Sequence, residues 1–384
     1  MRLRWAILTL GLLALIPISG GAAGPAWEQW KTVPGVFDVG GPLSGGSLLV
    51  AGSAAYYTLT PAGDLAPFAR GAGGYRDDPG AEAYFAVSPG QHVGAAACDF
   101  VRDDAFVLRL HVPIGVTRVG KSGDETGSFA NLDLPGLNGI AFDTEGLFDH
   151  RLLVTGPVNG KSEVVAIDCT GAVTVITRTA PAFEGGLAVA PTGFGSFGGS
   201  LIAPDELSGV IWAIAPDGTA TQVAKSGLPV GGDVGVESVG FVPKGFARGG
   251  ELYYADRKTP GNPHPGTDSV LRMSSSDLVA GGVQDGDMLA ITEGGASMID
   301  VRCAATCAVA LIIGTPTTAH GEGHLAFTLN KVGSPSPSAR PTVAATPAAS
   351  KSGSGGVPIA VLIVVAVLAA AAGAGVAVAL ARRR

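Results

Sequence analysis

Charged side chains are scarce in this chain of 384 residues: Asp, Glu, Lys and Arg make up 15% of it, and the net charge is -7. A nucleic-acid partner requires a basic face that neutralises phosphates, so this charge balance argues against one. Long amphipathic helical patterns are also missing, whereas Gly (59) and Pro (26) are abundant. This composition favours an all-β fold of short strands joined by tight turns.

Several catalytic motifs are missing from the part of the chain between its two hydrophobic ends. It contains no Cys-x-x-Cys pair, no Gly-x-Ser-x-Gly elbow and no phosphate-binding glycine loop. Readings as a dithiol redox protein, a serine hydrolase or a nucleotide-dependent enzyme therefore lose support.

The N-terminus has the pattern of a secretory signal peptide. Arg2 and Arg4 precede an apolar run over residues 6–18, and small residues follow up to Gly24. The alternative is an uncleaved anchor, but roughly 13 apolar residues are short for a membrane span. We expect residues 1–23 to be a signal peptide cleaved near Ala23, which would place the protein outside the cytoplasm.

The C-terminus has the pattern of a membrane anchor. Residues 357–381 carry no charge and are followed by three arginines, residues 382–384. At 1.5 Å per residue such a helix is about 37 Å long, enough to cross a bilayer core of ~30 Å. We expect one transmembrane helix, a cytoplasmic basic tail and an extracytoplasmic domain before them. Trimming of the helix by a sorting protease is the alternative.

Residues 333–356 separate this helix from the rest of the chain. They are rich in Ser, Pro, Ala and Thr and contain no aromatic residue. Such a segment cannot bury enough apolar surface to fold, so we expect a disordered linker between the domain, residues 25–332, and the membrane.

The middle of the chain repeats with a period of about 50 residues. One marker is a glycine between two apolar alternating runs, as expected for tight hairpins: Gly63, Gly115, Gly171 and Gly218. The second marker is a carboxylate or amide that opens a strand: Glu82, Asn138, Glu184, Glu237 and, in a fifth unit, Glu293.

Repeats of this length with about four short strands each predict a β-propeller. We expect six blades, with seven as the alternative. Their approximate bounds are residues 35–73, 83–121, 138–180, 185–229, 237–292 and 296–330. The last unit supplies only three strands, so we expect residues 27–33 to complete it as the outermost strand and close the ring.

One unit resembles a known family. The segments Glu184-Gly-Gly-Leu-Ala-Val, Leu201-Ile-Ala-Pro-Asp, Gly209-Val-Ile-Trp-Ala-Ile and Pro216-Asp-Gly are similar to one blade of the six-bladed lactonase-like propellers. That superfamily includes gluconolactonases, paraoxonase-like esterases and strictosidine-synthase-like proteins. The resemblance is best over residues 138–260, and it implies the fold without fixing an activity.

The strand-opening residues of a propeller approach one another around the central channel. Carboxylates confined in this way repel unless they are protonated, hydrated or neutralised by a cation, and oxygen ligands suit Ca²⁺. The resemblance implies a calcium ion at this point, with Glu82, Asn138, Glu184 and Glu237 as candidate ligands. Glu293 and Glu322 are further metal candidates. The alternative is that these residues are solvated and cap loop ends.

A second cluster is His320-Gly321-Glu322-Gly323-His324. Histidine transfers protons near neutral pH, and an alternating His-Glu-His can also bind a transition metal. On a strand its three polar side chains would share one side. His320 and His324 are therefore the candidate catalytic residues, and a polar surface loop is the alternative.

Two further loops are candidates for recognition. Asp205 and Glu206 lie in one of them, and an insertion over residues 256–268, which contains His264, forms the other. Loops on a rigid scaffold are where propellers place binding residues. Irregular backbone without a function is the alternative.

The chain has four cysteines, and in an oxidising compartment they can pair. Cys303 and Cys307 are close enough in sequence to bridge a short turn. Cys98 and Cys169 lie in neighbouring predicted blades, where they can form a disulfide or remain buried thiols.

Two functional classes fit these patterns. The first is a membrane-anchored binding or scaffold propeller for an extracellular protein or small molecule. The second is a Ca²⁺-dependent hydrolase of lactones or esters, in which the ion polarises the carbonyl and a histidine or carboxylate moves the proton. A quinone-dependent sugar dehydrogenase is less compatible, because the expected cluster of His and Arg is missing.

Overall fold

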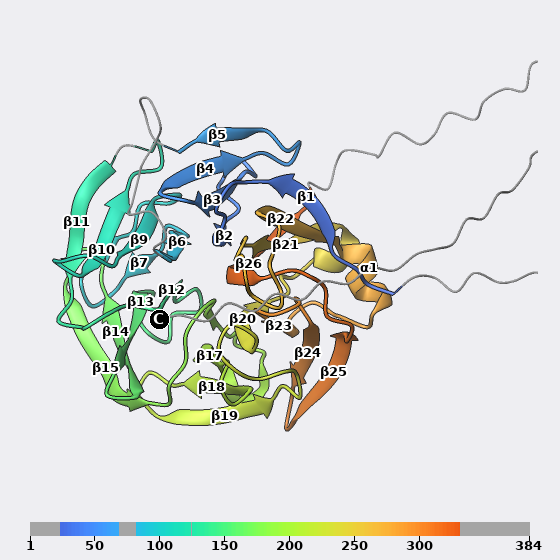
Figure 1. Cartoon of the computed structure of the whole chain (residues 1–384). Helices are drawn as coiled ribbons and strands as arrows, with labels where there is room; N and C mark the ends of the chain where they lie inside the picture. Colours follow the sequence, from blue (N-terminus) through green and yellow to red (C-terminus); the bar gives the residue numbers. More distant parts are fainter. Residues whose placement is uncertain (1–23, 69–81, 124, 331–384) are drawn as a thin grey trace, which may run out of the picture. The chain divides into compact units, whose positions relative to one another are not determined.

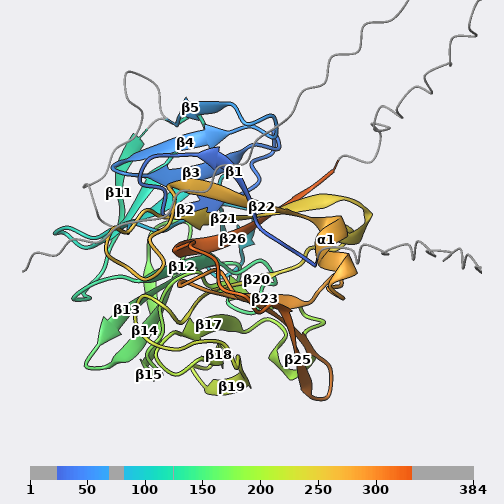
Figure 2. The same cartoon turned by 45° about the vertical axis from the view of Figure 1, so that its right-hand side comes forward.

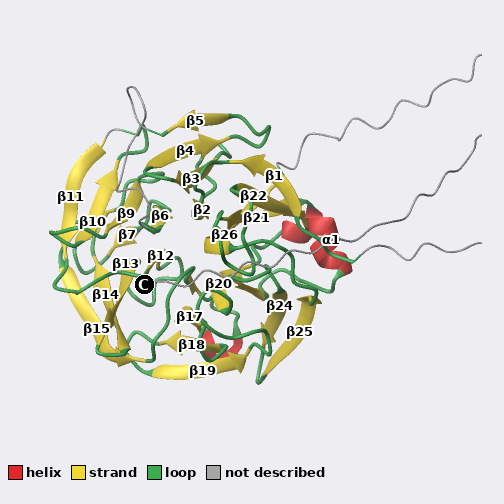
Figure 3. Ribbon diagram, viewed as in Figure 1, coloured by secondary structure: helices red, strands yellow, loops and turns green. Residues whose placement is uncertain are grey.

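The computed structural model describes residues 24–68, 82–123 and 125–330. These residues form six four-stranded antiparallel sheets, arranged as blades around a central channel (Figure 1). The expected all-β, six-bladed propeller is confirmed, and the seven-bladed alternative is wrong. Strands dominate the described residues, and the short helix α1 (Ser275–Ala280) lies at the rim (Figure 3).

Blades 1 to 4 are each made by one continuous piece of chain, from the innermost strand to the outermost. Blade 1 contains β2 (Asp38–Gly40), β3 (Leu48–Gly52), β4 (Ala55–Leu59) and β5 (Leu65–Pro67); blade 2 contains β6 (Phe85–Val87), β9 (Ala105–Arg109), β10 (Gly115–Val119) and β11 (Glu125–Asn131); blade 3 contains β12 (Gly139–Phe142), β13 (Leu152–Val158), β14 (Lys161–Ile167) and β15 (Val173–Ala180); blade 4 contains β16 (Ala188–Val189), β17 (Leu201–Asp205), β18 (Val210–Ile214) and β19 (Ala220–Lys225). A small hairpin, β7 (His92–Val93) and β8 (Cys98–Asp99), lies beside blade 2.

Blades 5 and 6 interlock, because the chain leaves blade 5 after its first strand and returns to it later. Blade 5 contains β20 (Val236–Phe241), β23 (Met288–Thr292), β24 (Met298–Cys303) and β25 (Cys307–Ile313); blade 6 contains β26 (Gly321–Leu329), β21 (Gly250–Asp256), β22 (Ser269–Ser274) and β1 (Glu28–Thr32). The expected boundaries of these two blades were therefore wrong. Periodicity counts strands, but it does not reveal that β20 pairs with β23 across an intervening hairpin.

The N-terminal strand closes the ring as expected. β1 is the outermost strand of blade 6, where Glu28 faces Arg272 of β22. The guanidinium of Arg272 donates hydrogen bonds to the Glu28 carboxylate and lies 5.0 Å from the ring centre of Trp30. β1 and the innermost strand β26 thus come from opposite ends of the domain and complete one four-stranded sheet.

The turn glycines behave as expected at three of four positions. Gly63, Gly171 and Gly218 have φ angles of +89°, +85° and +83°, which a residue with a side chain rarely adopts. Gly115 was predicted to be a turn residue, but it begins β10 with an ordinary φ. A Cβ there would lie 2.0 Å from the carbonyl oxygen of Ala130 on β11, so close strand packing requires this glycine.

Both pairs of cysteines form disulfides. Cys303 and Cys307 are register partners at the end of the β24–β25 hairpin. Cys98 and Cys169 join the hairpin beside blade 2 to a turn of blade 3, with Cα atoms 6.0 Å apart. The described part of the chain contains no free cysteine.

No helix among the described residues is long and apolar enough to cross a membrane. The predicted signal peptide, linker, transmembrane helix and basic tail lie outside the described residues, and these assignments stay predictions.

Candidate functional site

The N-terminal ends of the innermost strands meet around the channel. The amide of Gly185 donates to the carbonyl of Asn138 over 3.0 Å, and the amide of Gly186 donates to the carbonyl of Glu237 over 3.0 Å. A Cβ would lie 2.2 Å from the carbonyl oxygen of Glu237 in blade 5 at the first glycine, and 2.2 Å from that of Gly323 in blade 6 at the second. Glycine therefore lets blade 4 approach the innermost segments of other blades closely here, and it brings their strand-opening residues together.

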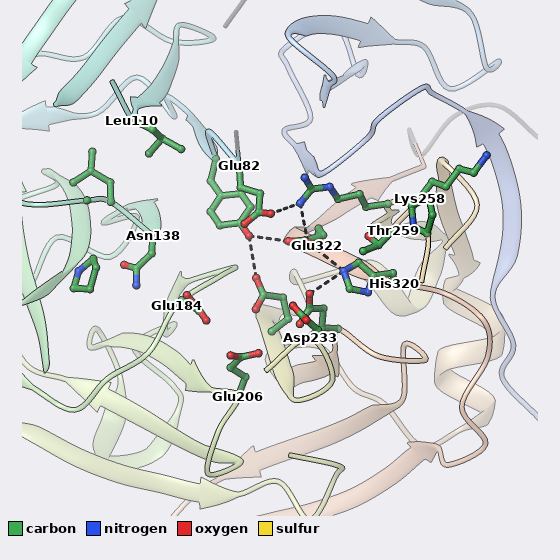
Figure 4. Close-up of a pocket in the computed structure, with 18 residues that line it drawn as sticks. Glu82, Leu110, Asn138, Glu184, Glu206, Asp233, Lys258, Thr259, His320 and Glu322 are labelled. Carbon is green, nitrogen blue, oxygen red and sulfur yellow. Dashed lines mark hydrogen bonds and ion pairs between the residues drawn. The ribbon is translucent and has the colours of Figure 1, made fainter. Parts of the chain in front are cut away.

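A cavity of about 820 Å³ lies at this end of the channel (Figure 4). All six predicted metal ligands line it, together with His320: Glu82, Asn138, Glu184, Glu237, Glu293 and Glu322. Glu206 and Asp233 add two more carboxyl groups. Arg257, Lys258 and His320 are the only basic side chains in the lining. The cavity is therefore strongly acidic, and we name it the acidic cavity.

Tyr84 joins two buried carboxyl groups of the acidic cavity. Its hydroxyl lies 2.8 Å from Oε2 of Glu322 and 3.1 Å from Oε1 of Glu237. A phenol has one hydrogen to donate, so one contact requires a protonated carboxyl group. Burial, followed by the charges of Glu322 and Glu293, raises the pKa of Glu237 well above its usual range. The raised pKa favours Glu237 as the group that holds this proton when Tyr84 donates its own hydrogen to Glu322.

His320 lies beside Glu293 and Glu322, and all three are nearly fully buried. Its Nε2 is 2.9 Å from Oε1 of Glu293 and 3.6 Å from Oε1 of Glu322. Burial lowers the pKa of His320, but hydrogen bonds to the two carboxylates outweigh this effect and raise the pKa to about 9. Its Nδ1 is buried without a hydrogen-bond partner among the described residues.

Glu184 and Glu206 form a carboxyl pair on the opposite side of the acidic cavity (Figure 4). Burial, followed by the hydrogen bond and the charge of Glu184, raises the pKa of Glu206 to about 8. One proton is therefore held near neutral pH by this pair, which prepares it either to exchange a proton or to release one to an incoming cation.

The oxygen donors of the acidic cavity fit a cation at two places. At the first place, one carboxylate oxygen from each of three residues lies within 4.8 Å of the other two: Glu206, Glu237 and Glu293. At the second place, the same limit holds for one ligand atom each of Glu293, His320 and Glu322. The first group offers only carboxylate oxygens, the donors that Ca²⁺ prefers. Glu82 and Glu322 already share the single positive charge of Arg257.

Asn138 is less available as a ligand than the sequence suggested. Its amide nitrogen donates to the carbonyl of Phe183 over 2.9 Å, and its Oδ1 accepts from the Thr155 hydroxyl over 3.0 Å. These bonds hold the side chain at the cavity wall and leave one lone pair of Oδ1 for a further partner.

The insertion over residues 256–268, which the sequence suggested as a recognition loop, supplies part of the cavity lining, through residues that the sequence did not single out. Arg257 makes an ion pair with Glu82 and a second one, at 3.3 Å, with Glu322. Lys258, Thr259 and Pro260 follow it along the cavity wall. His264, the residue noted in this insertion, does not line the cavity, and its Nδ1 lies 2.8 Å from the carbonyl oxygen of Thr317.

His324 does not join His320 in the acidic cavity, so the expectation that the two histidines share one side was wrong. The cause is an irregularity in β26: residues 323–325 lie between the register partners of Ala255 and Tyr253. Gly323 has a φ of +69°, which turns the strand and breaks the alternation of its side chains.

His324 instead crosses the channel. Its Nδ1 lies 3.0 Å from Oδ1 of Asp38 in blade 1, and its Nε2 lies 2.7 Å from the carbonyl oxygen of Ile140 in blade 3. Both partners are acceptors, so both ring nitrogens carry hydrogen and the ring is a cation. Burial lowers the pKa of His324, but the charge of Asp38 outweighs it and the pKa is raised.

A second cavity, of about 380 Å³, lies at the other end of the channel. Residues of the innermost strands and of the segments next to them give it an apolar lining: Phe85, Ile140, Phe142, Leu187, Phe241 and Leu325. His324 borders this cavity and does not line the acidic one.

Comparisons with known proteins give a likeness of fold alone. No protein-family model matches the chain, and no curated protein matches it. Among solved structures, virginiamycin B lyase from Staphylococcus aureus is 10% identical, with 79% of this chain and 96% of that one covered and a TM-score of 0.40. A putative gluconolactonase is 10% identical, with 77% and 83% covered and a TM-score of 0.42. A putative TolB from Agrobacterium tumefaciens is 13% identical, with 79% and 93% covered and a TM-score of 0.42.

Proposed function

We propose that this protein is an extracytoplasmic binding propeller, anchored by its C-terminal segment, whose acidic cavity holds a divalent cation and, through it, an oxygen-rich small ligand. The observation that carries the proposal is the convergence of Glu206, Glu237 and Glu293 on one point of a cavity far larger than an ion. Three carboxylates would supply about half of the oxygen ligands of a Ca²⁺ ion, and oxygens of the bound small ligand or of water would supply the rest.

The charge of the acidic cavity supports a cation. Its carboxyl groups outnumber its basic partners, and burial raises the pKa of Glu82, Glu237 and Glu293 above their usual range. A raised pKa means that a buried carboxyl group resists ionisation. Glu82 and Glu293 already have positive partners in Arg257 and His320. A bound cation would add positive charge and allow the other carboxyl groups of the cavity to ionise as well.

The test is thermal unfolding of the purified protein with Ca²⁺ and with chelator. A ligand bound only by the folded state adds about 2.7 kcal/mol at 100 times its Kd, so Ca²⁺ is expected to raise the midpoint by several degrees. Mg²⁺ should have less effect, because it demands a tighter octahedral shell. An unchanged midpoint would exclude a cation in the cavity. The control is Asp217→Asn, on an exposed turn of blade 4, which should respond like the wild type.

A second candidate function is hydrolysis of lactones or esters, and the proton-exchanging groups of the cavity favour it. His320 lies 2.9 Å from Glu293, and the pKa of Glu206 is about 8. Such groups give and take protons near neutral pH, and a bound cation would supply polarisation of the substrate carbonyl.

A screen of lactones and aryl esters distinguishes the two functions. The hydrolase reading predicts turnover that is lost in His320→Gln and in Glu206→Gln and kept in His264→Gln, since His264 lies outside the acidic cavity. Binding of an added lactone without turnover would support the binding propeller. Turnover that survives in His320→Gln and Glu206→Gln would contradict the hydrolase reading.

A further inference from the structure

The outermost strands of a propeller are open sheet edges, and natural proteins protect such edges with charge, proline or short length. Five blades follow this rule. Each of their outermost strands carries a charged residue or a proline: Lys31 in β1, Pro67 in β5, Glu125 in β11, Arg178 in β15 and Lys225 in β19.

The outermost strand of blade 5 has none of these features. β25 reads Cys-Ala-Val-Ala-Leu-Ile-Ile and contains no polar side chain apart from its bonded cysteine. Residues 308–311 are all exposed, with Val309 at 42% and Leu311 at 64%. The strand lies at the outer rim of the propeller, where it forms a hairpin with β24 (Figures 1 and 2). It is an exposed, apolar edge strand.

This edge is held in place by the rest of the protein. The Cys303–Cys307 disulfide closes the hairpin, and both sulfur-bearing residues pack into a buried cluster between blades 4 and 5. At the tip, Gly195 of blade 4 lies so close that a Cβ there would be 2.4 Å from the carbonyl oxygen of Ala304. β25 is therefore a fixed strand, and pairing with it costs little ordering entropy.

The outer side of β25 has free backbone hydrogen-bonding groups. Alternate residues of an antiparallel edge strand direct their N–H and C=O groups away from the sheet. Within the described part of the chain, residues 308–312 make backbone hydrogen bonds to β24 alone. Another strand can therefore add to this edge with a full set of main-chain bonds.

The character of β25 points to its own copy as the occupant. When two identical strands pair antiparallel across a two-fold axis, the residue on the axis faces its own equivalent and every other residue faces a different residue of the same strand. β25 would then place aliphatic groups against aliphatic groups in every register, whereas β15 and β19 would place the charge of Arg178 or Lys225 against an uncharged residue or against its own copy. We propose that β25 is a self-association edge, which pairs with β25 of a second copy to form an eight-stranded sheet across two propellers.

The expected dimer is weak in solution. One strand of seven residues buries much less than the roughly 1,200 Å² of a stable interface. The dimer should therefore dissociate on dilution and form readily where copies are concentrated.

Single introduced cysteines test the pairing in the full-length chain, since all four native cysteines are bonded. Four variants are oxidised under mild conditions, and covalent dimer is then separated from monomer without reductant: Ala308→Cys, Val309→Cys, Ala310→Cys and Leu311→Cys. The proposal predicts a covalent dimer that is strongest at the position on the two-fold axis and at least tenfold weaker at its neighbours. Ala305→Cys, at the exposed hairpin tip beside the native disulfide, is the matched control and should give none.

Three results would overturn the proposal: no dimer at any of the four positions, equal dimer yields at these positions and at Ala305, or linkage to a different protein. Leu311→Lys supplies a second test, because it places one lysine on each of the two paired strands, where the charges repel and lose their water. It should abolish the dimer in light scattering while the unfolding midpoint stays unchanged. Val173→Lys on β15, where the side chain is 41% exposed, should leave the dimer intact. If Leu311→Lys does not fold, Val309→Lys tests the same repulsion.

Discussion

β26 and the residue just before it place two histidines in the channel, and their surroundings differ in a way that separates structure from function. His324 has an acceptor at each ring nitrogen, namely the Asp38 carboxylate and the Ile140 carbonyl. His320 has carboxylates at one nitrogen and, among the residues that the structure describes, no partner at the other. A buried cation whose hydrogen-bond donors all have acceptors is typical of a structural ion pair. Surplus carboxylates and a ring nitrogen without a hydrogen-bond partner are typical of a ligand-binding site.

The first prediction is that the ion pair between Asp38 and His324 makes a large contribution to the free energy of unfolding. Asp38 is fully buried and also accepts hydrogen bonds from the amides of Val39, Phe85 and His324, over 2.8 to 3.0 Å. Asp38→Ala leaves these donors and the imidazolium unpaired, so it should cost about 3–5 kcal/mol of unfolding free energy. Urea unfolding measures the loss.

The control for this prediction is Asp217→Ala, at an exposed turn, which should leave the unfolding free energy close to that of the wild type. A loss below about 1 kcal/mol in Asp38→Ala would mean that the charge pair with His324 does not hold the blades together.

The second prediction concerns Glu237, at the acidic end of the channel. Glu237→Gln keeps the shape and a hydrogen for Tyr84, because the amide NH₂ can donate to the phenol oxygen. In chelator the variant should match or exceed the wild type in stability, since it buries one fewer ionisable group. It should lose most of the Ca²⁺-induced rise in midpoint. A response to Ca²⁺ equal to the wild type would remove Glu237 from the proposed ligands.

The contrast between the two ends also explains what the sequence could and could not predict. Local signals predicted the glycine turns, as at Gly218, and the strand-opening carboxylates, as at Glu237. The ring then brings every strand opening to one end of the channel, so repetition in sequence sufficed to assemble most of the acidic cavity.

The rest depended on long-range packing, which leaves no periodic trace. The pairing of β20 with β23 bypasses a hairpin that has the same strand pattern. Arg257 reaches Glu82 and Glu322 from an irregular insertion. The bulge at Gly323, which sends His324 to Asp38, looks in sequence like any His-Gly-Glu-Gly-His strand.

The third prediction compares two neighbouring basic residues of the acidic cavity, Arg257 and Lys258. Arg257 forms ion pairs with both Glu82 and Glu322, whereas the side chain of Lys258 extends away from the labelled carboxylates (Figure 4). Arg257→Ala should strengthen Ca²⁺ binding by about tenfold, or ~1.4 kcal/mol, because the cavity gains negative charge. Lys258→Ala is the matched control and should change it by less than about twofold. Calorimetry measures both, and equal effects would mean that Arg257 does not compete with the cation.

The smallest expected effect is the pH dependence of stability at Glu206. Because its pKa is raised to about 8 in the folded state from 4.5, the folded protein holds this proton where the unfolded chain has lost it. The resulting stability is fully present below about pH 4.5 and is lost as the pH rises through 8. In chelator, the unfolding midpoint should therefore fall between pH 5 and pH 8.5 by more in the wild type than in Glu206→Gln. Saturating Ca²⁺ should reverse this trend, because the ion binds the ionised pair of Glu184 and Glu206. The same fall in midpoint with and without Ca²⁺ would mean that Glu206 is not a ligand of the cation, and the acidic end of the channel would then be as purely structural as the end that holds His324.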